Sequence, residues 1–332
     1  MADFQRFAVL GGGAFGTALA VSLRAAGRDV SIWARDPAVV AKINQRHANN
    51  VYLAGCALDP GIAATGDLSA SARADALLMA VPAQQLRGVA EKLTGLVRGG
   101  QPVIICAKGI EEASGKLMHE VLAEALPQAQ AAVLSGPGFA EEIARGLPVA
   151  ITLAATDETM GRALASAIGH KAFRPYWTSD VIGVELGGAV KNVLAIAAGA
   201  VEGSGLGASA HAALVTRGFA ELRRLAAALG GRAETLMGLS GLGDLILTCS
   251  SHQSRNFRLG HELGRGRKLA DILGVKGGLA EGAYTAAAVR RIAAARNIEM
   301  PICEAVAAIL AGRLTVGAAI EALLSRPFKA EE

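Results

Sequence analysis

The stretch that decides the fold is residues 7–16, Phe-Ala-Val-Leu-Gly-Gly-Gly-Ala-Phe-Gly. Phe7–Leu10 is an apolar run typical of a buried strand, and Gly11, Gly13 and Gly16 then match the spacing G-x-G-x-x-G. In such a strand–turn–helix unit the first glycine allows a tight turn, the second lets the backbone approach a pyrophosphate, and the third lets helix and strand pack closely. The amides and dipole of the new helix would then hold the anion. The stretch predicts a dinucleotide-binding turn; a glycine-rich turn without a ligand is the alternative.

The rest of the first half alternates apolar runs with helical spacing. The expected strands after Phe7–Leu10 are Val30–Trp33, Ala76–Val81, Val103–Ala107, Ala131–Leu134 and Ala150–Ala154. Helices are expected over Gly16–Ala26 and Pro37–Arg46. Continuous apolar strands separated by helices indicate a parallel sheet covered on both faces, and right-handed crossovers make it doubly wound. We therefore expect an α/β, Rossmann-type N-terminal domain.

The second half has a different pattern. Long segments rich in alanine and leucine predict helices over Glu185–Val201, Ala208–Leu229, Thr285–Arg296 and Ile302–Ala311, and no strand is expected there. A chain of 332 residues, 52% of them hydrophobic, exceeds what one core usually organises. We expect a nucleotide-binding domain over residues 1–182 and an all-helical substrate and catalytic domain over 183–332, with the active site in the cleft between them.

Composition argues against several classes of protein. The net charge is only +4 and aromatic residues make up 4%, so a nucleic-acid-binding role ranks last. The four cysteines form no CxxC pair, which predicts a reduced, cytoplasmic protein. The six histidines show no metal-binding spacing, so no metal is expected. No signal peptide is expected either, and the apolar helix around Val193–Val201 is predicted to be too short to cross a bilayer.

The tip of the second expected strand bears on the choice of cofactor. Dehydrogenases specific for NAD usually carry an acidic residue there, but this chain has Arg35 followed by Asp36. A guanidinium group suits a 2′-phosphate through paired hydrogen bonds. The sequence therefore favours NADP(H), with NAD(H) possible if Asp36 binds the ribose instead.

Several strings together resemble the bacterial NAD(P)-dependent glycerol-3-phosphate dehydrogenase family, over nearly the whole chain. In order, they are GGGAFGTALA (residues 11–20), VPAQQLR (81–87), AKGIE (107–111), LSGPGFAE (134–141), GVELGGAVKNVLAIAAG (183–199), GLSGLGDLILT (238–248) and QSRN (253–256). The resemblance implies reversible reduction of dihydroxyacetone phosphate by NAD(P)H to sn-glycerol 3-phosphate, a precursor of glycerophospholipids.

The resemblance also implies residue roles. Lys191 would be the catalytic acid/base, and Lys108 would contact both substrate and cofactor. The remaining substrate positions would be Gly136, Gly138, Asp244, Ser254, Arg255 and Asn256. The remaining cofactor positions would be Ala14, Phe15, Arg35, Ala140, Arg255, Leu279 and Glu281, in addition to the glycines of the turn. The chain departs from the family pattern at Gly138, where relatives often have Thr or Ser, at Phe15, which replaces Trp or Tyr, and at Ala54, which replaces Pro.

The residues themselves support part of this assignment. Lys191 shares a helical face with small residues such as Gly187, Gly188 and Ala195, which suits a face lining a cleft. Partial burial would lower its pKa toward neutrality, so it could donate a proton to a developing alkoxide. Asp244 could accept a hydrogen bond from it. The alternatives are a lysine that extends to the surface and a turn aspartate.

Lys108 follows an expected strand, and ligands bind at that end of doubly wound sheets. In residues 254–256, Ser-Arg-Asn, the guanidinium group of Arg255 and the two neighbouring side chains could donate hydrogen bonds to a phosphate. The alternative is a helix start that is capped by Ser254. Residues 135–139 are expected to form a strand-to-helix turn whose amides face the substrate, unless the turn is purely structural. Glu281 is expected on a loop, and Glu111, Glu141 and Glu142 in first turns of helices.

Two other functions stay open. One is a dehydrogenase for another anionic substrate, such as a hydroxy acid or a ketopantoate-like ketone. The other is a non-catalytic NADP(H) sensor, although such a protein would not need Lys108, Lys191 and Asp244 together. The sequence also leaves open a homodimer formed through the helical domains.

Overall fold

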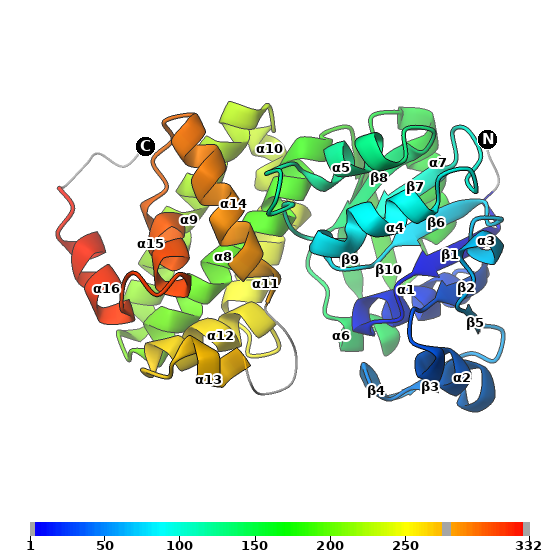
Figure 1. The fold of residues 1–332 in the computed structure, drawn as a ribbon, viewed down its shortest axis with the longest axis horizontal. Coiled ribbons are helices and arrows are strands. Elements are labelled where there is room, and N and C mark those ends of the chain that lie inside the picture. Colours follow the sequence, from blue (N-terminus) through cyan, green and yellow to red (C-terminus); the bar gives the residue numbers. More distant parts are fainter. Residues whose placement is uncertain (1–3, 274–279, 328–332) are drawn as a thin grey trace.

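The computed structural model describes residues 4–273 and 280–327. A twisted sheet with flanking helices forms one half of the molecule, and a bundle of helices forms the other (Figure 1). The predicted fold class, a Rossmann-type sheet followed by a helical part, is confirmed.

The sheet has eight strands in the order β10-β9-β8-β7-β6-β1-β2-β5. The strands are β1 (Arg6–Leu10), β2 (Asp29–Trp33), β5 (Ala63–Thr65), β6 (Ala76–Met79), β7 (Pro102–Ile105), β8 (Gln130–Ser135), β9 (Val149–Ala154) and β10 (Phe173–Thr178). From β5 to β8 all pairs are parallel, and the order changes direction between β1 and β6, as in doubly wound folds. The expectation of a parallel sheet is wrong at one point, because β9 runs antiparallel to β8.

The sequence pattern missed both edge strands of this sheet. β5 has three residues, and β10 contains Pro175 and the exposed Arg174 and Tyr176. Edge strands tolerate proline and polar residues because one side of their backbone needs no partner. They therefore lack the continuous apolar run that identified the inner strands. A small hairpin, β3 (Ala48–Asn49) and β4 (Leu53–Ala57), was missed as well.

Helices cover both faces of the sheet. They are α1 (Ala14–Ala25), α2 (Pro37–Arg46), α3 (Leu68–Ser71), α4 (Leu86–Lys92), α5 (Met118–Ala125), α6 (Ala140–Ala144) and α7 (Glu158–Ile168), with a short 3-10 turn, η1 (Ala83–Gln85). Two hydrophobic clusters fill the spaces on either side of the strands. The turn expected at residues 135–139 connects β8 to α6.

In the helical half, the other helices pack around α8 (Val181–Gly203), which contains Lys191. The other elements are α9 (Gly207–Leu229), α10 (Ala233–Leu236), a π-helical turn η2 (Leu239–Gly243), α11 (Asp244–Cys249), α12 (Arg255–Gly264), α13 (Leu269–Leu273), α14 (Glu281–Ala295), α15 (Pro301–Leu310) and α16 (Val316–Leu324). Beyond residue 180 the part of the chain that the structure describes contains no strand.

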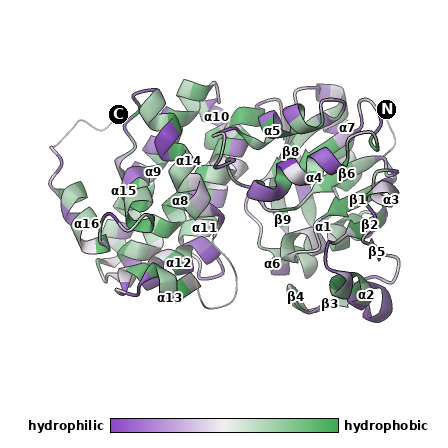
Figure 2. Ribbon diagram, viewed as in Figure 1, coloured by the Kyte–Doolittle hydropathy of each residue, from purple (hydrophilic) through white to green (hydrophobic). Residues whose placement is uncertain are grey.

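The length expected for the apolar helix is wrong, because α8 has 23 residues and is long and apolar enough to span a membrane. The most apolar part of α8 is, however, 94% buried within the protein. Figure 2 shows the predominantly hydrophobic α8 among the other helices of the bundle. Packing in the helical core therefore accounts for its composition.

Candidate active site

One large pocket, about 1420 Å³ in volume, lies at the carboxyl ends of the sheet strands and is lined from both halves of the molecule. It includes the predicted residues Gly11, Gly13, Ala14, Phe15, Arg35, Lys108, Gly138, Ala140, Arg255, Asn256 and Glu281. Leu279 lies outside the described residues. The position agrees with the rule that doubly wound sheets bind ligands outside the carboxyl ends of their strands.

The glycine turn has the geometry that a dinucleotide requires. Gly11 has a φ of +128°, and a Cβ atom there would lie 2.6 Å from the carbonyl oxygen of Ala80. A Cβ atom on Gly16 would lie 2.0 Å from the carbonyl oxygen of Gly11, so α1 can pack against the turn only with glycine at this position. A Cβ atom on Gly13 would meet nothing within 4 Å, and no side chain caps α1. The open space and the helix N-terminus fit a pyrophosphate.

Arg35 and Asp36, the second and third residues after β2, differ in their hydrogen bonding. Asp36 caps α2, because its Oδ1 accepts a hydrogen bond from the amide of Ala38 at 2.8 Å. Arg35 is exposed and lines the pocket beside it. The structure thus gives Asp36 a local role that Arg35 does not share.

Behind the pocket wall, three segments far apart in sequence bring two lysines to one aspartate. The Lys191 ammonium group donates to Asp244 Oδ1 at 2.6 Å and to Thr248 Oγ1 at 2.7 Å. The Lys108 ammonium group donates to Asp244 Oδ2 at 2.8 Å and to the carbonyl oxygen of Gly136 at 2.8 Å. The two ammonium groups therefore share the single carboxylate of Asp244. We call Lys191, Asp244 and Lys108 the lysine array.

Burial sets the charge states of the lysine array. Desolvation lowers the pKa of Lys191 to about 8, with Asp244 opposing this shift and the Lys108 charge adding to it. Desolvation alone would raise the pKa of Asp244, but the two ammonium groups outweigh it and hold that pKa below its usual value. Asp244 is therefore a carboxylate at neutral pH, while Lys191 is an ammonium group whose pKa suits proton transfer.

Two residues of this site were not singled out from the sequence. Thr248 lies one helical turn after Asp244 on α11 and contacts Lys191. Asn192 lines the pocket, donates to the carbonyl oxygen of Lys108 at 3.1 Å and accepts from the Asn256 side chain at 2.9 Å. The spacing of four residues from Asp244 was the available signal for Thr248, since i and i+4 side chains share a helical face.

The three side chains of the Ser254–Asn256 segment do not all face the pocket as possible phosphate ligands. Ser254 caps α12 by accepting from the amide of Phe257 at 3.2 Å, and it is buried. The Asn256 side chain bonds Asn192 and accepts from the amide of Gly282 at 3.0 Å. Arg255 is exposed to the pocket. Of the three, the arginine is the one that offers its side chain most freely to an anion.

Other expected positions need correction. Lys191 does not line the pocket itself; its side chain is only 7% exposed and lies behind Lys108, which does. Glu281 is the first residue of α14 rather than part of a loop, and its Oε1 accepts from the amide of Ala83 at 3.1 Å. Glu111 lies in a loop and pairs with Arg87 instead of starting a helix. Glu141 and Glu142 do lie in the first turn of α6.

Two further observations concern possible ligands. The second carboxylate oxygen of Glu281 is buried with no hydrogen-bond partner among the described residues, and burial raises the pKa of this group. All four cysteines are free, and within residues 4–273 and 280–327 no group of three or more His, Cys, Asp or Glu side chains could hold a metal ion.

Comparison with known proteins identifies the family. The model of the NAD-dependent glycerol-3-phosphate dehydrogenase N-terminus matches residues 6–161, and the model of its C-terminus matches residues 180–321. The chain belongs to the NAD-dependent glycerol-3-phosphate dehydrogenase family. It is therefore an oxidoreductase that depends on an NAD(P) cofactor and acts on a small molecule.

Relatives of this family match the chain along its length. It is 57% identical to a glycerol-3-phosphate dehydrogenase [NAD(P)+] of Parvibaculum lavamentivorans, covering 99% of this chain and 98% of the relative. It is 56% identical to that of Caulobacter vibrioides, covering 99% of each. The crystal structure of the Coxiella burnetii glycerol-3-phosphate dehydrogenase has a TM-score of 0.93 at 38% identity, covering 97% of this chain and 99% of that one. A ketopantoate reductase from Ralstonia eutropha, at 16% identity and a TM-score of 0.61, shares only the fold.

Proposed function

We propose that this member of the glycerol-3-phosphate dehydrogenase family reversibly reduces dihydroxyacetone phosphate to sn-glycerol 3-phosphate with NAD(P)H. The observation that carries this proposal is the lysine array, of which Lys108 lines the same pocket as the glycine turn while Lys191 and Asp244 lie behind the pocket wall. Relatives at 56–57% identity are named for this activity.

We assign the proton to Lys191. When bound, NAD(P)H would supply the hydride, and the residues of this chain would have to stabilise the negative charge that develops on the carbonyl oxygen of the substrate. Lys191 supplies the proton, since its lowered pKa makes the transfer easy near neutral pH, and this requires the bound substrate to reach past the pocket lining to the ammonium group of a side chain that is only 7% exposed. Lys108, which lines the pocket, stabilises the developing charge, and Asp244 orients both ammonium groups. This arrangement supports acid–base catalysis worth roughly 10²–10⁴-fold in rate.

The remaining roles follow the position of each residue. We propose that Arg255 pairs with the substrate phosphate and that Ser254 and Asn256 hold the start of α12 in place around it. The other proposed substrate contacts are Gly136 and Gly138. The proposed cofactor contacts are Gly11, Gly13, Ala14, Phe15, Gly16, Arg35, Lys108, Ala140, Arg255, Leu279 and Glu281.

We propose NADP(H) as the favoured cofactor because the exposed Arg35 can pair with a 2′-phosphate, while Asp36, which lines the same pocket, has one carboxylate oxygen engaged as a helix cap. The Arg35→Ala variant should raise KM for NADPH and leave KM for NADH nearly unchanged. Equal effects on both cofactors would contradict this preference.

Further proposals concern the setting of the enzyme. We place the division between a nucleotide-binding domain and a substrate domain at residues 182 and 183. We also propose that the enzyme is cytoplasmic, supplies glycerophospholipid synthesis and forms a homodimer through its helical half.

The test is spectrophotometric. Oxidation of NADPH and NADH is followed with dihydroxyacetone phosphate, and with unphosphorylated dihydroxyacetone, for the wild type and the Lys191→Ala variant. Phosphate-dependent turnover is expected, with a loss of about 10²-fold or more in the variant and nearly unchanged cofactor affinity. Equal turnover of both ketones would favour a dehydrogenase for another substrate. Cofactor binding without turnover would favour a sensor.

A further inference from the structure

The residues that connect β7 to α5 form a loop, residues 106–117, that lies between the two halves of the molecule. Lys108 is near its start. Ile110 and Leu117 are buried in the hydrophobic cluster of the helical half, although the loop leaves a strand of the sheet. The position of the Lys108 ammonium group therefore depends on contacts that fix this loop from both sides.

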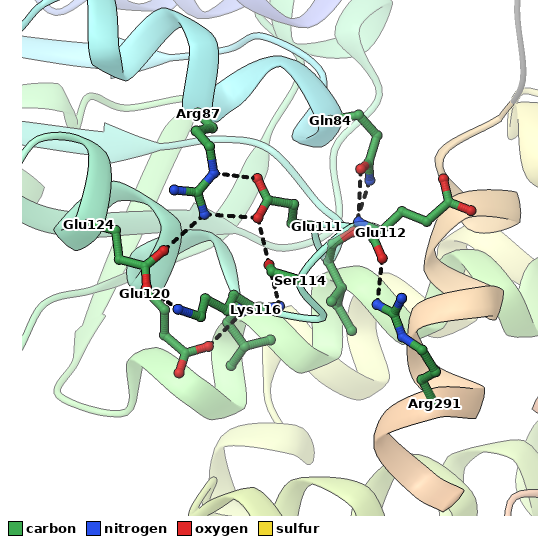
Figure 3. Close-up of polar contacts among 11 residues, drawn as sticks. Gln84, Arg87, Glu111, Glu112, Ser114, Lys116, Glu120, Glu124 and Arg291 are labelled. Carbon is green, nitrogen blue, oxygen red and sulfur yellow. Dashed lines mark hydrogen bonds and ion pairs between the residues drawn. The ribbon is translucent and has the colours of Figure 1, made fainter. Parts of the chain in front are cut away.

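One contact comes from η1. The Gln84 side-chain amide donates to the carbonyl oxygen of Ile110 at 2.8 Å, and its oxygen accepts from the amide of Glu112 at 2.9 Å. These two bonds fix the backbone on either side of Glu111 (Figure 3).

A stronger contact comes from α4. Arg87 donates to both carboxylate oxygens of Glu111, through Nε and Nη2, each at 2.9 Å. Ser114 donates to the same carboxylate at 2.5 Å, so Glu111 closes the loop on itself as well as on α4 (Figure 3). Paired arginine–carboxylate bonds give directional as well as electrostatic restraint. Arg87 does not line the pocket, although its helical neighbours Gly88 and Glu91 do, so its side chain is connected to the site through Glu111.

The helical half holds the other side of the loop. Asn192 donates to the carbonyl oxygen of Lys108, and Arg291 on α14 donates to that of Glu112. Between them, a Cβ atom on Gly109 would lie 2.8 Å from the side chain of Ala83 and 3.1 Å from a carboxylate oxygen of Glu281. The loop therefore has little room to move toward either half as long as Arg87 keeps Glu111 in place.

We propose that Arg87, acting through Glu111, is a positioning residue that holds the Lys108 ammonium group between Gly136 and Asp244. The inference rests on the proposed function, because it takes Lys108 and Lys191 as the groups that act on the substrate. Arg87 also pairs with Glu124 on α5, and Glu124 in turn pairs with the half-exposed side chain of Lys116 in the loop.

A specific readout follows from the surroundings of Lys191. The charged or titratable groups that act on it are Asp244 and Cys249 from α11 and Lys108 from the loop, and the Thr248 hydroxyl is its other hydrogen-bond partner. The Lys108 charge lowers the pKa of Lys191. If the loop shifts and Lys108 moves away from Asp244, the pKa of Lys191 must rise. A loss of stability without a change at Lys108 would not produce this effect.

The experiment measures kcat/KM for dihydroxyacetone phosphate against pH, because this profile reports groups of the free enzyme. Arg87→Met should lower kcat/KM by about 10-fold, since small displacements of a catalytic group reduce the rate strongly. It should also move the alkaline limb to higher pH, in the same direction as Lys108→Met and by less. Arg87→Lys should restore part of both effects. Glu124→Gln, the matched control, removes the other ion pair of Arg87 together with the exposed Lys116–Glu124 pair, and should leave the profile unchanged because the Arg87–Glu111 pair remains.

A double variant makes the test decisive. In the Lys108→Met background, Arg87→Met should cause no further loss of rate and no further shift of the limb. Fully additive effects, or an unshifted limb in Arg87→Met, would overturn the inference. If Arg87→Met does not fold, Glu111→Gln removes the same ion pair and is judged by the same criteria. Wild-type enzyme without activity on dihydroxyacetone phosphate would instead refute the proposed function.

Discussion

Two ionic clusters lie at opposite ends of the loop at residues 106–117, and they differ in charge balance and in burial. The lysine array has two ammonium groups for one carboxylate, with Asp244 and Lys191 almost fully buried. The second cluster, which we call the arginine cluster, matches Arg87 and Lys116 against Glu111 and Glu124, and the Lys116 and Glu124 side chains are 40% and 42% exposed.

The titration behaviour of the two clusters differs accordingly. In the lysine array, desolvation dominates and lowers the pKa of Lys191 to about 8. In the arginine cluster, hydrogen bonding from Arg87 dominates and lowers the pKa of Glu111. Similar distances therefore produce different chemistry: surplus positive charge in a buried place creates a group that can exchange a proton, whereas matched charges near the surface create a support that stays ionised.

The largest expected effect comes from removing the carboxylate of the lysine array, the more deeply buried of the two clusters. Asp244→Asn leaves the desolvated Lys191 ammonium group, and that of Lys108 at the pocket wall, without a counter-ion, so the free energy of unfolding should fall by about 3–5 kcal/mol. Urea unfolding at neutral pH measures it. Glu111→Gln is the matched control in the arginine cluster, and an equal loss there would contradict the distinction between the two clusters.

A second effect is the dependence of stability on pH. The pKa of Lys191 is about 8 in the folded protein and 10.5 in a free lysine, so between these pH values the unfolded chain binds more protons. Stability from this group should therefore rise with pH across that window, by at most about 3 kcal/mol. The difference between wild type and Lys191→Met, followed by urea unfolding from pH 7 to 11, isolates the contribution. A difference that falls with pH would show that the folded pKa is raised instead.

A smaller effect is expected at Thr248. Thr248→Val keeps the shape of the side chain but removes an oxygen that accepts from the buried Lys191 ammonium group. The expected loss is about 1–3 kcal/mol in the free energy of unfolding, together with a lower kcat. Thr216→Val, at an exposed helical threonine, is the control. An unchanged kcat would indicate that Asp244 alone orients Lys191.

The smallest effect belongs to the exposed edge of the arginine cluster. Lys116→Met removes an ion pair with Glu124 in which both side chains are partly exposed to water. Solvent and salt screen such pairs, so neither the unfolding midpoint nor kcat should change measurably. A clear loss of kcat would mean that the whole cluster, rather than the Arg87–Glu111 pair, fixes the loop.

Some features of the molecule followed from local patterns. The glycine turn at residues 11–16 was predictable because a strand, a turn and a helix N-terminus are adjacent in the chain, and only glycine fits at residues 11 and 16. The inner strands were predictable because burial on both faces requires a continuous run of apolar residues. The long helices were predictable because burial on one side requires apolar residues at helical spacing. Edge strands β5 and β10 were missed because they are buried less and carry no such continuous apolar run.

The charge relations were decided by the tertiary structure. Lys108, Lys191 and Asp244 come from three segments, and their sharing of one carboxylate depends on how α8, α11 and the loop at residues 106–117 pack together. The same holds for Arg87 and Glu111, which lie 24 residues apart. Residue types and spacing specify which groups can ionise. Their pKa values depend on desolvation and on the distances between charges, and these exist only after the two cores have formed.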